Sequence, residues 1–241
     1  MSLDRSLDTN LSKLKTNEYP GRGIVIGMTA NLKHLVQIYW IMGRSENSRN
    51  RVFEVDGDFI RTKAFDESKV TDPSLIIYYP VKCFNSWHIV TNGDQTETIY
   101  EALKSDKSAE SALMTRMYEP DEPHFTPRIS GIINNSTNQK AYMLSILKSA
   151  FEGKICQRVF FNYDNFIPGV GHCIHTYANN GNPIPSFGGE PFTVPIADSI
   201  DDNARTYWET LDQNNRISLL VKYIDTETNK TDFRIINKHS S

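Results

Sequence analysis

Three arginines, two asparagines and two serines lie within the nine residues from Gly43 to Arg51, directly after the apolar segment His34–Met42. A planar guanidinium can hold a phosphate or a carboxylate through two hydrogen bonds, and Ser and Asn add neutral donors around the same anion. A strand that ends in such a block places fixed cations at the edge of a sheet. The block therefore predicts an anion site, although a solvated loop with surface ion pairs has the same composition.

Two further arginines lie at predicted turns or strand starts. Arg22 ends the turn Tyr19-Pro-Gly-Arg22, and Arg128 follows Pro127 at the start of a strand. Each alone is most simply a solvated turn arginine. Together with the three arginines of the block, they favour a ligand that carries a phosphate.

The segment Asn92-Gly-Asp-Gln-Thr96 lies between a predicted strand and a predicted helix. Asp94 and Thr96 can cap the free N–H groups at the start of the helix, which is a structural role. Asn92 and Gln95 are not needed for capping, and a helix N-terminus also suits an anion. We therefore expect Asn92 and Gln95 to contact a ligand.

Titratable side chains occur in two other places. His172 and Tyr177 follow Gly169 and Gly171, which would let the backbone approach a ligand closely. His172 and His175 fall on opposite faces of a strand, so they make a poor metal pair. Of Tyr78 and Tyr79, one ring must face the core and the other can face a pocket. For Tyr78 and His172, ordinary roles as core and loop residues compete with proton transfer.

The elements that position these residues are mostly strands. The apolar and β-branched pattern predicts nine to eleven strands and three or four helices, with hairpins at Val52–Thr62 and Arg216–Ile236. Helices are expected at Leu3–Leu14, Thr96–Lys104, Ala109–Met117 and Asp201–Leu211. Hairpins with helices in blocks favour an α+β fold in which two mostly antiparallel sheets pack face to face between helices. No repeat or linker divides residues 1–241, which predicts a single domain.

Composition excludes several functional classes. The net charge is −3, with no basic stripe, so RNA or DNA is an improbable partner and a small anionic ligand is favoured. No apolar segment approaches the length of a membrane span. Three widely spaced cysteines argue against a disulfide framework and a cysteine zinc site. With no signal peptide recognised at the N-terminus, we expect a cytoplasmic protein that needs neither a metal nor an organic cofactor.

These motifs, in this order, resemble the archaeal-type IMP cyclohydrolase family. The resemblance rests on the Tyr19–Arg22 turn, Tyr39, the Gly43–Arg51 block, Tyr78, the Asn92–Thr96 segment, Thr126–Ile129 and Gly171–Tyr177. Archaeal members carry Phe-Pro within the arginine block, which this chain lacks. The resemblance implies a four-layer αββα sandwich like that of N-terminal-nucleophile hydrolases, without an N-terminal nucleophile, and analogy suggests a homo-oligomer.

The resemblance also implies a reaction, in which 5-formamidoimidazole-4-carboxamide ribotide closes to inosine monophosphate and water. On this hypothesis Arg22, Arg49 and Arg51 bind the phosphate, with Arg44, Asn50, Arg128 and Tyr177 as further ligand contacts. Asn92 and Gln95 hold the carboxamide or formyl oxygen. Tyr78 and His172 transfer protons, and Asp94 orients them.

Three alternatives remain open at this point. One is a different ribotide- or amide-processing enzyme on the same scaffold, in which Glu119, Asp121 or Glu190 acts as an acid. Another is a nucleotide-binding protein without turnover. The third, an RNA-binding protein, is disfavoured by the negative net charge.

Overall fold

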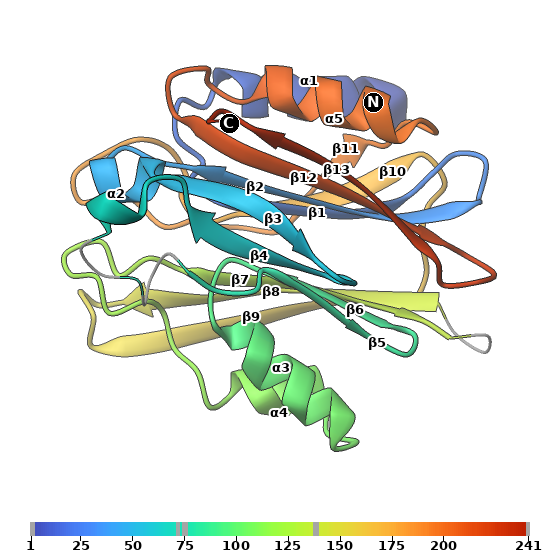
Figure 1. Cartoon of the computed structure of the whole chain (residues 1–241), viewed down its shortest axis with the longest axis horizontal. Helices are drawn as coiled ribbons and strands as arrows, with labels where there is room; N and C mark the ends of the chain where they lie inside the picture. Colours follow the sequence, from blue (N-terminus) through green and yellow to red (C-terminus); the bar gives the residue numbers. More distant parts are fainter. Residues whose placement is uncertain (1–2, 71–72, 74–76, 137–139, 240–241) are drawn as a thin grey trace.

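The computed structural model describes residues 3–70, 73, 77–136 and 140–239, which form two antiparallel sheets stacked between helices (Figure 1). The first sheet has the strand order β11 (Phe192–Pro195), β10 (Val170–His175), β1 (Gly23–Met28), β2 (His34–Met42), β12 (Arg216–Asp225) and β13 (Thr231–Asn237). The second has the order β3 (Arg51–Asp56), β4 (Phe59–Ala64), β5 (Val81–Phe84), β6 (Trp87–Thr91), β7 (Arg128–Asn135), β8 (Lys140–Ala150) and β9 (Ile155–Tyr163). The second sheet is thus a meander, whereas the first pairs strands that are distant in sequence.

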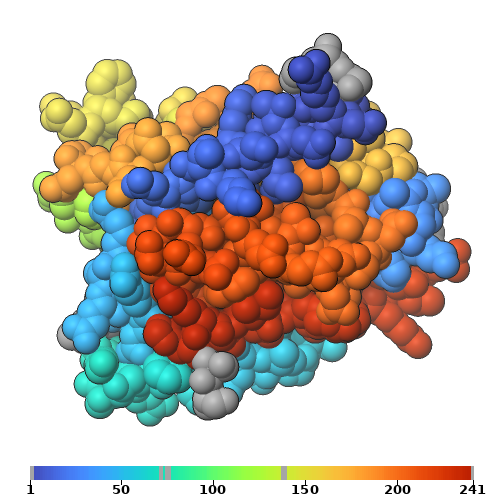
Figure 2. Space-filling view, turned by 90° about the horizontal axis from the view of Figure 1, so that it is seen from above, coloured from blue at the N-terminus to red at the C-terminus, as the bar shows by residue number. Residues whose placement is uncertain are grey.

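Helices cover the outer faces of both sheets. α1 (Leu3–Thr16) and α5 (Ile200–Thr210) lie side by side over the first sheet, as Figure 2 shows from above. α3 (Gln95–Lys104) and α4 (Ala109–Leu113) lie against the second sheet (Figure 1). The predicted α+β class, with two large antiparallel sheets and few helices, is confirmed.

The core has three apolar layers that follow the alternation of side chains along the strands. Ile24 and Ile26 of β1 belong to the cluster between the sheets, whereas Val25 belongs to the cluster under α1 and α5. A third cluster lies between the second sheet and α3 and α4. Both faces of β1 and β2 are therefore buried, which explains why they are continuous apolar segments rather than alternating ones.

A basic pair interrupts the cluster between the sheets. Lys222 of β12 is fully buried, and its Nζ lies 3.1 Å from Nδ1 of His88 on β6. No carboxylate among the described residues pairs with Lys222. Burial lowers the pKa of Lys222 to about 8 and that of His88 to about 3. The pair is thus a cost to stability that the surrounding apolar packing offsets.

The C-terminal strand fastens the two sheets together. The side-chain amide of Asn237 accepts a hydrogen bond from the backbone N–H of Phe53 at 2.9 Å and donates one to the Phe53 carbonyl at 3.0 Å. The Ser218 hydroxyl donates to the same amide oxygen. Asn237 therefore imitates a strand partner for β3 across the gap between the sheets.

Most predicted elements are present, with differences at their ends. Both predicted hairpins are confirmed, and Gly57 in the first turn has the positive φ of 62° that glycine tolerates. The predicted helix Ala109–Met117 ends at Leu113. The four-residue helix α2 (Glu46–Arg49) and strand β11 were not predicted. No helix in the described part of the chain is long and apolar enough to cross a bilayer.

Candidate active site

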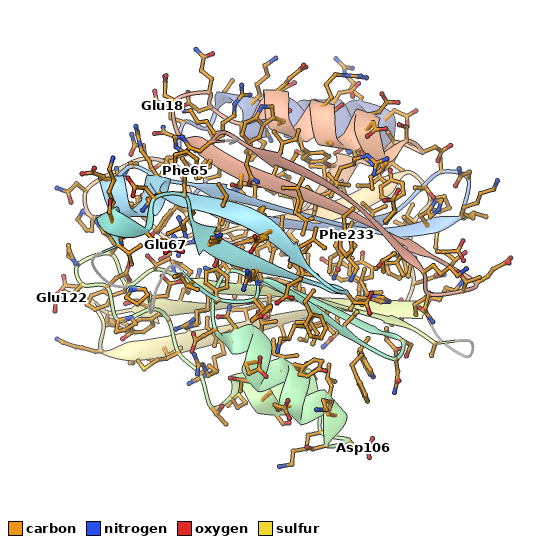
Figure 3. The ribbon with its side chains drawn as sticks, viewed as in Figure 1. Glu18, Phe65, Glu67, Asp106, Glu122 and Phe233 are labelled. Carbon is orange, nitrogen blue, oxygen red and sulfur yellow. The ribbon has the colours of Figure 1, made fainter. Side chains whose placement is uncertain are left out.

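Several loops that carry the predicted ligand residues gather at one end of the sandwich. Arg22 precedes β1, Tyr78 precedes β5, Asn92 follows β6 and Arg128 begins β7. This is the end of the molecule where α2 lies in Figure 1 and where Glu18, Glu67 and Glu122 are seen in Figure 3. Because the strands are antiparallel, starts and ends of different strands meet here, which brings distant motifs together.

A buried ion pair lies at the centre of this region. Nη2 of Arg22 is 2.9 Å from both carboxylate oxygens of Glu119, and the two side chains are only 10% and 7% exposed. Burial raises the pKa of the Glu119 carboxyl, and the nearby charges of Arg22 and Arg128 oppose that rise. Nε of Arg22 is buried and has no acceptor within the described residues. The Arg22 guanidinium therefore uses Nη2 for Glu119 and keeps Nε as a free donor.

Arg51 is a second buried cation in the same place. It is 3% exposed, and its Nε donates to the Ser48 carbonyl at 2.8 Å. No carboxylate among the described residues forms an ion pair with it. Burial lowers the pKa of Arg51, while electrostatic interaction with Tyr78 raises it and that with Arg22 lowers it further. A buried guanidinium without an anion is the usual mark of an anion site.

Two tyrosine hydroxyls lie against these cations. The hydroxyls of Tyr39 on β2 and Tyr78 are 2.8 Å apart, and both side chains are buried. Burial raises the pKa of both, and the charges of Arg22 and Arg51 oppose that rise in both. Either hydroxyl can donate in this bond. When Tyr39 donates, the proton of Tyr78 is free to face a ligand.

A hydrogen-bonded chain connects Glu119 to Arg128. Asn92 donates to Glu119 at 3.4 Å and to the Pro127 carbonyl at 2.9 Å, and its oxygen accepts from Gln95 at 3.0 Å. Gln95 in turn accepts from Nη1 of Arg128 at 2.8 Å. Asn92 and Gln95, expected to be free for a ligand, have both amide groups engaged within the protein. They position Glu119 and Arg128.

Asp94 differs from its predicted role. It makes no side-chain capping bond to α3, because its carboxylate pairs with Arg128 at 2.6 Å and with Arg116. These two arginines lower the pKa of Asp94 against the raising effect of its burial. The predicted cap is wrong at Asp94, while Thr96 does bond the Gly93 carbonyl at 3.1 Å.

Two glycines allow the close approaches in this region. A Cβ on Gly93 would lie 2.5 Å from Nη1 of Arg128, and one on Gly21 would lie 2.2 Å from the Thr176 hydroxyl. Gly21 also has a φ of +75°, which side chains rarely adopt. Gly21 belongs to the Tyr19–Arg22 turn and Gly93 to the Asn92–Thr96 segment, two motifs noted in the sequence.

Tyr177 forms the wall next to Arg22. Its hydroxyl bonds Thr126, whose own hydroxyl and N–H bond Asp121. Burial raises the pKa of Tyr177 to about 12, with Arg22 opposing the shift. Its ring stacks on Tyr19 with centroids 5.8 Å apart. Tyr177 thus lies in the cluster as predicted from its position, whereas its role remains a prediction.

The other predicted residues of the arginine block are placed differently. Arg44 is exposed, donates to Asn180 and Gly181, and lies over the Tyr19 ring. Arg49 is exposed and donates to the Gly43 carbonyl. Asn50 is buried but bonds the backbone of Asp66 on both sides of its amide. Of the three arginines in the block, Arg51 alone is buried beside Arg22.

His172 lies apart from this cluster. Its Nδ1 is 2.6 Å from the Tyr142 hydroxyl, and its ring lies 4.4 Å from that of Tyr163, between the sheets. Burial lowers its pKa. Within the described part of the chain, the side-chain contacts of His172 are with Tyr142 and Tyr163 and not with Arg22 or Arg51, so the structure does not bring it to the proton-transfer position that the sequence suggested. His175 lies on the other face of β10, where it lines a cavity with Lys13 and Leu14 of α1, as the strand alternation predicted.

Sequence reasoning underrated Glu119 and Tyr39. Glu119 lies in an irregular segment, where its backbone N–H bonds the Thr126 carbonyl at 2.8 Å, and no periodicity marks it. The only signal was a run of acids around prolines, Glu119-Pro-Asp121. Tyr39 lies within an apolar strand and reads as core. Neither could be assigned before the sheets were placed together.

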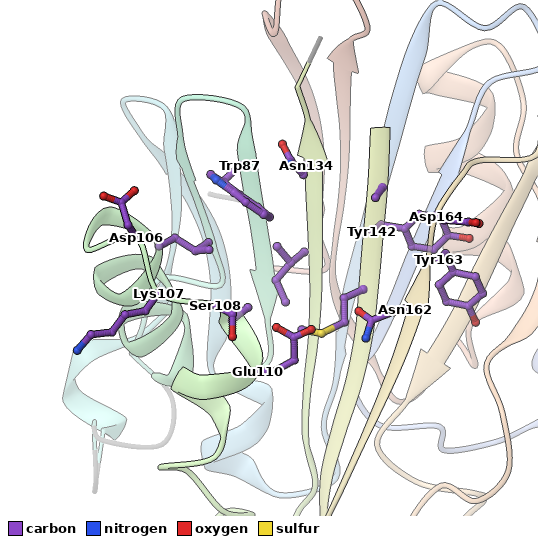
Figure 4. Close-up of a pocket in the computed structure, with 15 residues that line it drawn as sticks. Trp87, Asp106, Lys107, Ser108, Glu110, Asn134, Tyr142, Asn162, Tyr163 and Asp164 are labelled. Carbon is purple, nitrogen blue, oxygen red and sulfur yellow. The ribbon is translucent and has the colours of Figure 1, made fainter. Parts of the chain in front are cut away.

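A large cavity lies elsewhere. It has a volume of about 840 Å³ on the outer face of the second sheet beside α4, lined among others by Trp87, Ser108, Glu110 and Met143 (Figure 4). None of the predicted ligand residues lines it. No group of three or more His, Cys, Asp and Glu side chains that could hold a metal occurs among the described residues.

The protein is an α+β protein of two packed antiparallel sheets. At one end it buries the guanidinium groups of Arg22 and Arg51, which keep hydrogen-bonding or ion-pairing capacity that the described residues do not use. A family model described as IMP cyclohydrolase-like protein matches residues 19–229. The chain therefore belongs to the IMP cyclohydrolase-like family. An IMP cyclohydrolase of Methanococcus aeolicus is 29% identical over 129 residues, which are 52% of this chain and 63% of that protein. The match thus spans less than two thirds of the curated relative.

Proposed function

We propose that the protein is an IMP cyclohydrolase, which closes 5-formamidoimidazole-4-carboxamide ribotide to inosine monophosphate with loss of water. The proposal is supported by family membership and by the name of the archaeal relative. One structural observation carries it: among the described residues, the buried Arg51 has no carboxylate partner, and Nε of the neighbouring Arg22, which pairs with Glu119, has no hydrogen-bond acceptor. A ligand that carries an anion and a reacting carbonyl can pair its anion with Arg51 and accept a hydrogen bond from Nε of Arg22 at its carbonyl oxygen.

Arg51 binds the phosphate in this proposal. Its guanidinium is desolvated by burial, and a phosphate supplies the missing charge and hydrogen-bond acceptors. Arg22 is bound to Glu119 through one nitrogen, which leaves Nε for an uncharged or developing oxygen. We therefore revise the sequence-based hypothesis, which gave both arginines to the phosphate.

Ring closure requires that the carboxamide nitrogen attack the formyl carbon. The N–C bond forms while the C=O electron pair moves to oxygen, and Nε of Arg22 stabilises that charge. Glu119 accepts the carboxamide proton, since Arg22 and Asn92 hold its carboxylate in a fixed orientation. The oxyanion then takes that proton from the Glu119 carboxyl, which gives a carbinolamine with the former formyl oxygen as its hydroxyl.

Water then leaves. The C–O bond breaks as the Tyr78 hydroxyl donates its proton to the departing hydroxyl group, and the proton on the former formamide nitrogen passes to the Tyr78 oxygen as the C=N bond forms. Tyr78 is suited to this step because the Tyr39 hydroxyl lies 2.8 Å from its oxygen and can donate to it. Arg51 and Arg22 favour release of its proton. The two protons that leave with the oxygen thus come from the two substrate nitrogens.

The finer fold assignment is also a proposal. The helix–sheet–sheet–helix layers support an N-terminal-nucleophile-hydrolase-like architecture. An N-terminal nucleophile is not part of the proposed mechanism, which uses the side chains of Arg22, Glu119 and Tyr78. The reacting groups come from the interior of the chain.

The direct test is conversion of the formamido ribotide by the purified protein, followed by ultraviolet absorbance and by chromatographic identification of inosine monophosphate. Arg51→Met should lower kcat/KM about 100-fold, the usual order for loss of one buried charged contact. Arg49→Met is the matched control, since that arginine is exposed in the same block, and it should remain near the parent value. Absence of turnover in the parent protein, with inosine monophosphate bound tightly, would show a binding protein instead.

A further inference from the structure

A second cavity lies on the outer side of the first sheet, between α1 and the segment that follows β10. Its volume is about 430 Å³, and its apolar wall includes Leu14, Phe187 and Phe192. His175 lines the same cavity. None of the arginines of the proposed active site takes part in it.

His175 presents an unused hydrogen-bond acceptor. The side chain is 6% exposed, and its Nδ1 lies 2.8 Å from the carbonyl oxygen of Tyr177. A carbonyl can only accept, so Nδ1 carries the hydrogen. Burial lowers the pKa of His175 to about 4, so the ring is neutral near pH 7 and Nε2 carries a lone pair. Within the described residues, Nε2 has no hydrogen-bond partner.

The surroundings of His175 define what would satisfy it. The rings of Phe187 and Phe192 meet the imidazole edge-on, with centroids 4.6 and 5.7 Å away, which leaves a flat apolar wall. Lys13 at the rim is exposed and has no ion-pair partner in the part of the chain described. No acidic residue lines the cavity. A ligand here needs an N–H donor for Nε2 and an anionic group for Lys13.

We propose that this cavity is a second binding site, for a planar heterocycle that carries a ring N–H and an anionic group, with His175 as the hydrogen-bond acceptor. Purine nucleotides with a protonated ring nitrogen, such as guanosine monophosphate, have this chemistry. The volume lies within the range of small-molecule sites. The Nε2 lone pair, which has no partner within the described residues, can accept a hydrogen bond from such a donor.

The cavity shares a wall with the proposed active site. Asn17 lines it, accepts a hydrogen bond from the N–H of Tyr19 at 3.1 Å and donates one to the Ala178 carbonyl at 2.9 Å. Tyr19 stacks on Tyr177 beside Arg22. A bound ligand thus touches the residues that hold this stack. Any effect on turnover rests on the proposed function, whereas binding itself does not.

The test measures binding of guanosine monophosphate by calorimetry to the Arg51→Ala variant, which weakens the active site. Adenosine monophosphate is the matched ligand control, because it has the phosphate but no ring N–H, and inosine lacks the phosphate. We expect both controls to bind at least tenfold more weakly. The ¹⁵N resonance of Nε2 of His175 should shift on saturation with guanosine monophosphate.

Three substitutions locate the site. Gly188→Trp should abolish binding by filling the cavity, since a Cβ there has no atom within 4 Å. His175→Asn keeps a donor for the Tyr177 carbonyl but is too short to place an acceptor at the Nε2 position, and should weaken binding tenfold. Lys13→Ala should weaken it, whereas Lys15→Ala on the same helix should not. Thermal melts establish that each variant is folded.

Two results would overturn the proposal: binding that persists unchanged in folded Gly188→Trp, or no binding of guanosine monophosphate to Arg51→Ala. If the parent enzyme still closes the ribotide in either case, the proposed function stands without a second site. If the site binds but no ribotide is closed, the second site stands and the proposed function falls.

Discussion

Removing the carboxylate of Glu119 should destabilise the fold as well as the reaction. Glu119→Gln leaves the Arg22 guanidinium buried at 10% exposure without its counter-ion, and with Arg51 as a neighbouring positive charge. Breaking a buried ion pair from one side costs about 3–5 kcal/mol. For a chain of this size, 1 kcal/mol corresponds to roughly 2–4 °C in Tm, so the melting temperature should fall by about 6–20 °C.

The double variant Arg22→Met/Glu119→Leu separates charge from packing. Replacing both partners by apolar groups of similar volume removes the uncompensated charge, so the free energy of unfolding should return to within about 1 kcal/mol of the parent or exceed it. Its activity should nevertheless be lost, since both the proton acceptor and the donor to the formyl oxygen are absent. Stability then recovers from the single to the double variant, whereas activity does not.

The measurement is urea unfolding monitored by tryptophan fluorescence, together with thermal melts and ribotide turnover. The reasoning fails if Glu119→Gln unfolds within 1 kcal/mol of the parent. In that case the carboxylate does not compensate a buried cation. Equal stabilities of the single and double variants would have the same meaning.

Three further predictions concern other parts of the site and core. Tyr39→Phe should lower kcat about tenfold with little change in KM. It should also move the basic limb of the pH profile of kcat to higher pH, because Tyr78 loses the hydrogen bond from Tyr39 that lowers its pKa. An unchanged profile would remove Tyr39 from the proposed mechanism. Gly93→Ala should displace the end of Arg128 and reduce kcat/KM by about tenfold, while circular dichroism and Tm stay near the parent because a flexible side chain gives way; full activity would contradict the close approach. In the parent protein, the folded pKa of Lys222 is depressed to about 8, so the free energy of unfolding should rise by about 3 kcal/mol between pH 8 and the ordinary lysine pKa near 10.5. Lys222→Met should remove that rise, as measured by urea titrations at several pH values. Parallel curves of unfolding free energy against pH for the two proteins would refute the prediction.

The sequence predicted the meeting of Arg22, Arg51 and Arg128 for a physical reason. All three lie at the start of a strand, and antiparallel packing gathers such positions at the ends of a sandwich. The same logic does not distinguish Arg51 from Arg44 and Arg49. That distinction depends on the helix α2, whose capping box between Ser45 and Ser48 points the two other arginines outward.

Other parts of the site depend on tertiary contacts that no local pattern encodes. Strand alternation correctly placed His172 and His175 on opposite faces, but the layer that each face meets follows from the sheet order. Asn92 was correctly placed near the cluster, but its satisfaction by Glu119, Pro127 and Gln95 requires three segments to converge. Side-chain types predicted the chemistry better than they predicted which groups are free.

The pairing of β2 with β12 and the clip from Asn237 to Phe53 have a consequence for how the chain matures on the ribosome. The second sheet joins consecutive strands, so it can assemble while synthesis is still in progress. The first sheet must wait for residues that emerge last, and until then β1 and β2 leave apolar faces open to water. Between the synthesis of Tyr163 at the end of β9 and that of β12, nascent chains therefore have one sheet with all its strands and one with exposed apolar faces, and we expect chaperones to matter most in this interval.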